Sequence, residues 1–177
     1  MDDLATDPSR RYACCPVCVS HFAAAAASRG ASAEWAIEHF SKPLFDHPQQ
    51  HVKRIGWCVD RDIAATVLYA NMHYGPTLYS CQRAEKSKSE QKMLYGKWGG
   101  AYILFSSFTA ARKFMRDLIV RGIKSESMRI NPNLRGIRMQ VPVIRFARYV
   151  STERIVEALS ANDNSRMIAA RAELCHE

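Results

Sequence analysis

The stretch "KWGGAYILFSSFTAARKFM", from Lys97 to Met115, decides the fold of the middle of the chain. Its apolar first half predicts a strand, in which alternate side chains face opposite sides. Ile103 and Phe105 therefore share one face, and Tyr102 lies on the other. The second half, after a corner rich in Ser and Thr, has the spacing of an amphipathic helix. We expect Phe105 to pack against Phe114 of this helix, which leaves Tyr102 on the opposite face.

Further strands and helices are predicted on both sides of this stretch. In chain order they are a strand at 51–59, a helix at 60–74, a strand at 77–83, a strand at 99–107, a helix ending at Gly122 and a strand at 137–150. Pro142 limits the last strand to an edge position or a bulge. The order β-α-β-β-α-β over residues 51–148 predicts an α+β fold, the ferredoxin-like split βαβ arrangement with an antiparallel sheet and helices on one face.

Two helical segments flank this core. In residues 1–50, an alanine-rich helix is expected at 19–29, before Gly30, and a second helix at 33–41, capped by Ser32. Residues 149–177 predict a C-terminal helical extension with amphipathic spacing.

The third predicted strand is similar to a known signature. It has, in order, a small residue, an aromatic, an aliphatic, any residue and an aromatic, which are Ala101, Tyr102, Ile103, Leu104 and Phe105. With the element order and the basic loop before this strand, residues ~52–146 resemble an RNA recognition motif. The resemblance implies RNA binding by aromatic side chains on the sheet. The chain departs from the family at Trp98, Gly99 and Gly100, where one outward ring of the family is missing.

The basic residues are concentrated in the middle of the chain. Residues 51–148 contain 18 Lys and Arg against 6 Asp and Glu, within a chain of formal net charge +8. Such a segment favours a polyanionic partner, either nucleic acid (RNA or a single strand) or an acidic protein; a solvated surface is the third explanation. The expected nucleic-acid-binding residues lie in the loop, the third strand and the second helix: Arg83, Lys86, Lys88, Lys92, Lys97, Trp98, Tyr102, Arg112, Lys113 and Arg116.

Tyr102 separates two models of this surface. If the sheet face is open, the ring stacks on a base, helped by Trp57 or Trp98. If a terminal segment packs on the sheet, the ring is buried and the nucleic acid is held by the basic loop and the second helix. We lean toward the second model.

Cysteines suggest a metal site near the N-terminus. Cys15 and Cys18, in "CPVC", have the spacing of a zinc knuckle, and His47 and His51 are the expected partners for one structural zinc. Cys14 and His21 are local competitors. A redox pair and ordinary buried thiols remain alternatives.

The motifs of common enzymes were not found. The sequence has no phosphate-binding loop with its Lys, no G-x-S-x-G and no H-E-x-x-H, so we expect a non-catalytic protein. No apolar run approaches the ~20 residues of a membrane span, and the acidic start differs from a targeting peptide, so a cytoplasmic location is expected.

Overall fold

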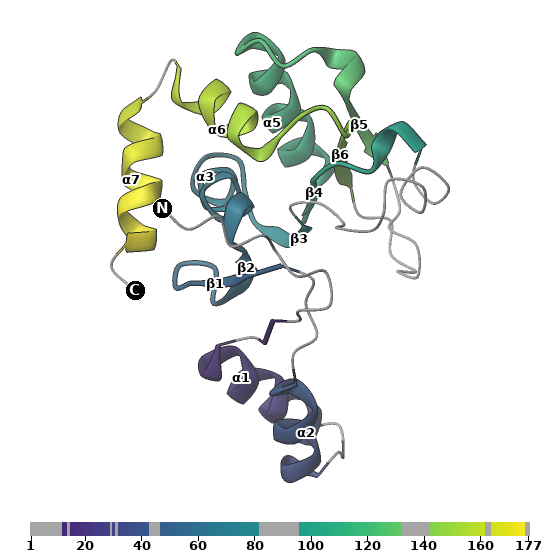
Figure 1. Cartoon of the computed structure of the whole chain (residues 1–177), viewed down its shortest axis with the longest axis vertical. Helices are drawn as coiled ribbons and strands as arrows, with labels where there is room; N and C mark the ends of the chain where they lie inside the picture. The colour runs from purple at the N-terminus through teal and green to yellow at the C-terminus, as the bar shows by residue number, and fades with distance from the viewer. Residues whose placement is uncertain are drawn as a thin grey trace, which may run out of the picture. The chain divides into compact units, whose positions relative to one another are not determined.

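The computed structural model forms two compact units, Met1–Arg61 (unit 1) and Asp62–Glu177 (unit 2) (Figure 1). It describes residues 12–13, 15–28, 30, 32–42, 47–81, 96–131, 142–161 and 164–175.

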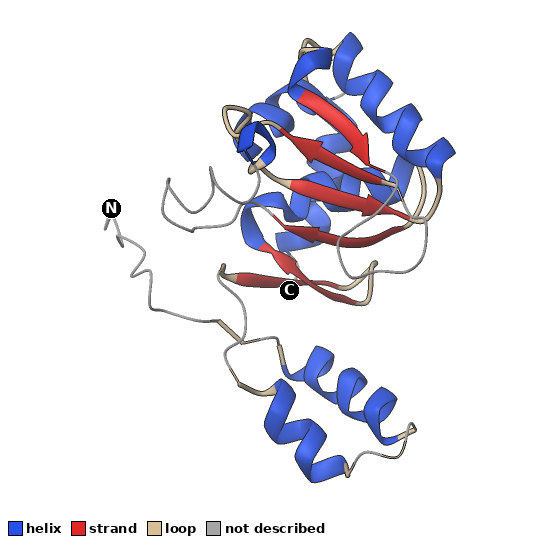
Figure 2. Cartoon of the chain, turned by 90° about the vertical axis from the view of Figure 1, so that its right-hand side faces the viewer, coloured by secondary structure: helices blue, strands red, loops and turns tan. Residues whose placement is uncertain are grey.

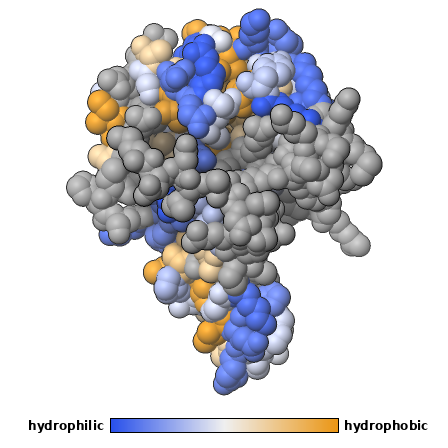
Figure 3. Space-filling view, in the orientation of Figure 1, coloured by the Kyte–Doolittle hydropathy of each residue, from blue (hydrophilic) through white to orange (hydrophobic). Residues whose placement is uncertain are grey.

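Unit 1 contains a helical pair and a hairpin. Its elements are α1 (Pro16–Ala27), α2 (Ala33–Phe40), β1 (Gln49–Val52) and β2 (Trp57–Asp60). Gly30 has a φ of 91°, a value that suits glycine, and the Oγ of Ser32 accepts a hydrogen bond from the Trp35 N–H at 3.1 Å. The two helices contact each other, with apolar and hydrophilic residues side by side on their surface (Figure 3). The predicted helical pair is therefore confirmed.

The predicted strand at 51–59 is a hairpin instead. The chain turns at 53–56, where the N–H groups of Ile55 and Gly56 both donate to the Val52 carbonyl at 2.9 Å. Gly56 has a φ of 86°, which closes the turn. The apolar alternation of the sequence changes phase between Val52 and Ile55, and this break marks the turn. β2 pairs only with β1, so it is not part of the main sheet.

Unit 2 contains a four-stranded antiparallel sheet and four α-helices among its described residues. Its elements are α3 (Ala64–His73), β3 (Thr77–Cys81), the 3-10 turn η2 (Gly96–Trp98), β4 (Tyr102–Phe105), α5 (Phe108–Val120), the 3-10 turn η3 (Ser125–Ser127), β5 (Met128–Asn131), β6 (Val143–Phe146), α6 (Thr152–Ser160) and α7 (Asn164–Cys175). A further 3-10 turn, η1 (Arg61–Ile63), precedes α3. The predicted α+β class is confirmed.

The strand order corrects the expected arrangement of the sheet. The order is β3-β4-β6-β5, and every neighbouring pair is antiparallel. A split βαβ sheet would place its first strand at the centre, but β6 is next to β4 instead. Pro142 does not confine β6 to an edge, because the strand begins after it, and the Pro142 carbonyl accepts the Phe105 N–H at 2.9 Å. β5 was not predicted.

The helix after β4 packs on one face of the sheet, as predicted. The Ser107 side chain caps α5 by accepting the Ala110 N–H at 3.2 Å. Phe114 is fully buried, with its ring centroid 5.4 Å from that of Phe105. Since side chains alternate along β4, Tyr102 lies on the opposite face. Figure 2 shows the strands of the sheet in front of the helices.

The C-terminal segment forms the expected helical extension. The Ser151 side chain caps α6 by accepting the Arg154 N–H at 3.2 Å, and Ile155 and Leu159 are fully buried. α6 and α7 both contact α3, and α6 also contacts α5, so these helices lie on the helical side of the sheet. The expectation that a terminal helix covers Tyr102 is therefore wrong for the C-terminal helices.

Candidate metal centre and candidate nucleic-acid interface

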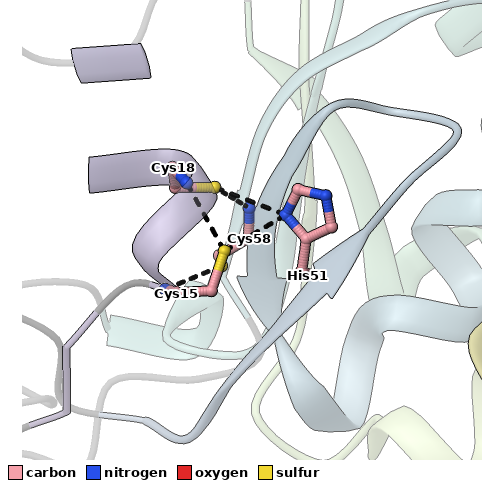
Figure 4. Close-up of side chains that lie close together, drawn as sticks. All are labelled: Cys15, Cys18, His51 and Cys58. Carbon is pink, nitrogen blue, oxygen red and sulfur yellow. Dashed lines mark hydrogen bonds between the residues drawn. The ribbon is translucent and has the colours of Figure 1, made fainter. Parts of the chain in front are cut away.

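Four side chains of unit 1 converge on one point (Figure 4). Cys15 and Cys18 lie at the start of α1, His51 on β1 and Cys58 on β2. Their ligand atoms all lie within 4.8 Å of one another, an arrangement that can hold a metal ion. We call these four residues the metal centre.

The distances within the metal centre suit tetrahedral coordination. His51 Nδ1 lies 3.3 Å from the Cys15 Sγ and 3.5 Å from the Cys18 Sγ. Zinc bonds of about 2.3 Å to sulfur and 2.0–2.1 Å to nitrogen, at tetrahedral angles, separate these atoms by about 3.5 Å. The side chains are therefore already close to the positions that such an ion requires.

Backbone N–H groups surround the sulfur atoms. The Cys18 N–H donates to the Cys15 Sγ at 3.4 Å, the Cys58 N–H to the Cys18 Sγ at 3.1 Å, and the Cys15 N–H to the Cys58 Sγ at 3.4 Å. Each cysteine thus donates to one sulfur and accepts at its own. N–H donors favour the thiolate, which is the form that binds metal.

The thiols of the metal centre have perturbed pKa values. Burial raises the pKa of the Cys18 thiol, and its side-chain contacts with Cys58 and Cys15 raise it further. Burial also raises the pKa of Cys58. At Cys15, hydrogen bonds from the Cys18 backbone and the Cys58 side chain outweigh burial and lower the pKa. A divalent cation would offset the cost of placing several thiolates together.

Local structure explains why these residues meet. Pro16 is the first residue of α1, where its missing N–H costs nothing, so "CPVC" becomes a helical first turn with both sulfurs on one side. In the hairpin, His51 pairs directly with Cys58, and such cross-strand neighbours lie about 5 Å apart. The turn between them brings the third and fourth ligands together.

The predicted ligand set is corrected at one position. Cys15, Cys18 and His51 belong to the metal centre, but Cys58 takes the place expected for His47. His47 is buried, and its carbonyl accepts the Gln49 Nε2 at 3.0 Å. The competitor His21 is exposed on α1, and Cys14 lies outside the described residues. The missed signal was the turn at Gly56, which places Cys58 opposite His51.

A second group of side chains lies on the sheet face of unit 2 that α5 does not cover. The Arg145 guanidinium carbon is 4.8 Å from the ring centroid of Tyr102, and that of Arg129 is 4.6 Å from the ring centroid of Trp98. Lys97 Nζ lies 5.0 Å from the same Trp98 ring. We call these five residues the sheet-face cluster.

Strand register brings the sheet-face cluster together. Tyr102 of β4 pairs with Arg145 of β6, and Arg145 pairs with Arg129 of β5. Burial, together with the positive charge of Arg145, lowers the pKa of Arg129. Tyr102 is half-buried and packs against a small apolar base formed by Leu104 and Val143. Two rings and three cations therefore meet on one sheet face.

The predicted nucleic-acid-binding residues fall in three places. Lys97, Trp98 and Tyr102 belong to the sheet-face cluster. Three others, Arg112, Lys113 and Arg116, are exposed on α5, on the helical side of the sheet. The remaining four, Arg83, Lys86, Lys88 and Lys92, lie outside the described residues. Arg145 was missed because its position next to Tyr102 depends on strand pairing.

Scans against family models, curated proteins and solved structures found no match to this chain. The resemblance to an RNA recognition motif therefore stays a prediction. Within the described residues, no helix is both long enough and apolar enough to cross a membrane.

Proposed function

We propose that this chain is a non-catalytic protein that binds single-stranded nucleic acid through the sheet-face cluster of unit 2. The observation that supports it best is the pairing of each aromatic ring with an arginine on one sheet face. Bases stack on aromatic rings and on guanidinium planes, and the same arginines attract phosphates.

The support beneath Tyr102 favours stacking. Leu104 and Val143 are buried below it, so the ring has a fixed apolar base. A ring that is already ordered loses little conformational freedom when a base binds. Because a base inside a duplex is covered by its neighbours, a single strand is the form that can use this surface.

The charges of the sheet-face cluster favour a polyanion. Arg129 and Arg145 are direct neighbours across two strands, and each raises the positive potential at the other. Like charges directly opposite each other destabilise a sheet, and a bound phosphate reduces that repulsion. Lys97 adds a third cation beside Trp98.

We infer that the ion of the metal centre is zinc with a structural role. Three thiolates and one imidazole are a donor set that zinc prefers, and four protein ligands leave no open position for a substrate. The ion joins the start of α1 to the hairpin. Protein purified without chelator is expected to contain about one zinc per chain by elemental analysis, and Cys58→Ser to lose it. Metal-free protein would contradict the assignment. Reduced thiols also fit the expected cytoplasmic location.

The proposed function is tested by fluorescence anisotropy with labelled oligo-dT, oligo-U and a duplex at several salt concentrations. Tyr102→Leu keeps the apolar contact with Leu104 but removes the ring. It is expected to weaken single-strand binding by about 5-fold to 150-fold, the value of one lost stack of ~1–3 kcal/mol. The matched control replaces Arg112, Lys113 and Arg116 of α5 by Ala, which removes three charges from the helical side.

Two results would contradict this proposal. One is the absence of single-strand binding by the unmodified protein at low salt; binding to an acidic polypeptide instead would favour the acidic protein partner. The other is an α5 triple variant that loses as much affinity as Tyr102→Leu does, because the site would then lie on the helices.

A further inference from the structure

The β1–β2 hairpin of unit 1 exposes an aromatic ring next to cations. Trp57, the first residue of β2, is 45% exposed. Lys53 and Arg54 are exposed in the turn just before it, and Arg61 is exposed just after β2. The hairpin therefore combines the same two kinds of side chain as the sheet-face cluster, on the other unit.

The acidic residue within the hairpin is buried. Asp60 is the one acidic residue in 47–61, and it is buried. Its carboxylate accepts the Gln49 Nε2 at 2.6 Å. The exposed charges within 47–61 are accordingly positive, and the exposed Asp62 follows directly after them.

A second exposed tryptophan of unit 1, Trp35, has acidic side chains on its own helix. Trp35 of α2 is 52% exposed, so it is as accessible as Trp57. Its ring stacks on His39, with centroids 4.9 Å apart, and Glu34 and Glu38 are exposed on the same short helix. Glu38 is paired with Lys42 at 3.0 Å, and within the described residues no cation is left in excess beside the ring, which makes Trp35 a control of lower positive charge within the same unit.

We propose that the β1–β2 hairpin is a second contact for the nucleic-acid strand, with Trp57 stacking on a base and Lys53 and Arg54 contacting phosphates. This inference rests on the proposed function, because it takes the same class of ligand. Charge complementarity and the exposed ring both favour a strand with accessible bases.

The metal centre positions this contact. His51 and Cys58 are a register pair, and the next pair toward the turn is Val52 with Trp57. On β2 the ligand Cys58 directly follows Trp57, and on β1 the ligand His51 directly precedes Val52, the strand partner of Trp57. Loss of the ion would release the hairpin from α1 and remove the second contact, while the sheet-face cluster belongs to the other unit.

Two contacts on separate units predict that affinity depends on strand length. A strand that reaches only one contact binds with the affinity of that contact. A longer strand engages both, and the second binding step becomes intramolecular, with a high effective concentration. We expect an oligo-dT of about 40 nucleotides to bind at least tenfold more tightly than one of about 8 nucleotides.

Tryptophan fluorescence tests the hairpin directly, because the chain has three tryptophans, at 35, 57 and 98. Three variants of the full chain each keep one Trp and replace the other two by Phe. Oligo-dT of about 40 nucleotides is expected to quench the variants that keep Trp57 or Trp98, since stacked bases quench indole emission, and to leave Trp35 unchanged. Zinc content, measured for each variant, verifies that unit 1 is intact.

Affinity measurements complete the test. Trp57→Ala is expected to weaken binding of the long strand by fivefold or more, while the affinity of the short strand and of the control Trp35→Ala stays unchanged. Replacing Lys53 and Arg54 by Ala should reduce the slope of log affinity against log salt by about 1–2 units. Chelation should reproduce the effect of Trp57→Ala.

The outcomes separate this inference from the proposed function. Quenching of Trp98 without any change at Trp57 would overturn the hairpin contact and leave the sheet-face site in place. No response at either residue would overturn both. Equal affinity for the short and long strands, after correction for the number of overlapping sites, would also overturn the second contact.

Discussion

The two units of the chain differ in the size of their buried side chains. Among the residues whose burial the structure describes, the eleven largest fully buried side chains lie between Ile63 and Leu159, all in unit 2. The buried apolar residues described in unit 1 are smaller: Cys18, Val19, Ala23, Val52 and Val59. Because hydrophobic stabilisation scales with the apolar area buried, unit 2 can fold by its own core, whereas unit 1 needs another source of free energy. We expect an ion bound at the metal centre to be that source.

Polar contacts also differ between the units. In unit 2, Arg121 joins three helices: its Nε donates to the Asp117 carboxylate of α5 at 2.8 Å, its Nη1 to the Leu159 carbonyl of α6 at 2.9 Å, and its Nη2 to the Tyr69 hydroxyl of α3 at 3.4 Å. The Tyr74 hydroxyl donates to the same Asp117 carboxylate. In unit 1, the corresponding links between distant segments are the N–H to sulfur bonds of the metal centre. Distant segments of unit 2 are thus joined by hydrogen bonds of Arg121 and Tyr74, and those of unit 1 by contacts among the residues of the metal centre.

Metal removal should give the largest difference in stability between the two units. Structural zinc supplies about 10–16 kcal/mol in small zinc peptides, more than any single core residue. Chelation is therefore expected to unfold unit 1 and to leave unit 2 folded, as measured by amide hydrogen exchange along the chain. Cys58→Ser should have the same effect, while Cys81→Ser, a half-buried cysteine of β3, should not. Uniform loss of protection in both units would show that they fold together.

Removal of a core ring should destabilise unit 2 and leave unit 1 unchanged. Phe114→Ala takes a fully buried ring from the contact between α5 and β4. Unit 2 is expected to lose about 3–5 kcal/mol of unfolding free energy, measured by urea denaturation, with the zinc content unchanged. A loss of zinc in this variant would mean that the metal centre depends on the core of unit 2.

Glycine substitutions sharpen the comparison. A Cβ at Gly100 would lie 2.6 Å from the Ala147 carbonyl oxygen, so Gly100→Ala must move the end of β6. We expect a loss of about 1–3 kcal/mol in unit 2. Gly30→Ala in unit 1 meets no atom within 4 Å and should cost only the strain of a positive φ, about 1 kcal/mol. Equal losses in thermal unfolding would contradict the steric explanation.

The smallest effects are expected at the helix caps. Ser32 caps α2 in unit 1 and Ser151 caps α6 in unit 2, each by one hydrogen bond to a backbone N–H. Replacing either by Ala should cost about 1 kcal/mol. Hydrogen exchange should place each loss in its own unit, and the zinc content should stay constant. A larger effect of Ser32→Ala would show that α2 supports the metal centre.

Local signals made part of the molecule predictable. The pairing of the two cysteines of "CPVC", the cap at Ser32 and the alternation of β4 depend on neighbours in the sequence, and the structure confirms them. Strand pairing depends on residues far apart, and the central position of β6 could not be derived from the order of elements. Cys58 and Arg145 were missed for the same reason, since each joins its site through a partner on another strand.

The strands and the turn of the β1–β2 hairpin differ in how freely their sequence can change. His51 and Cys58 point to the same centre because the number of residues between them is fixed; one inserted residue in either strand would turn its side chain to the opposite face. The residue types at Lys53 and Arg54 are not restricted in this way, because they form only the turn before Gly56. Substitutions at these two positions are therefore expected to change the charge at the tip without disturbing the metal centre.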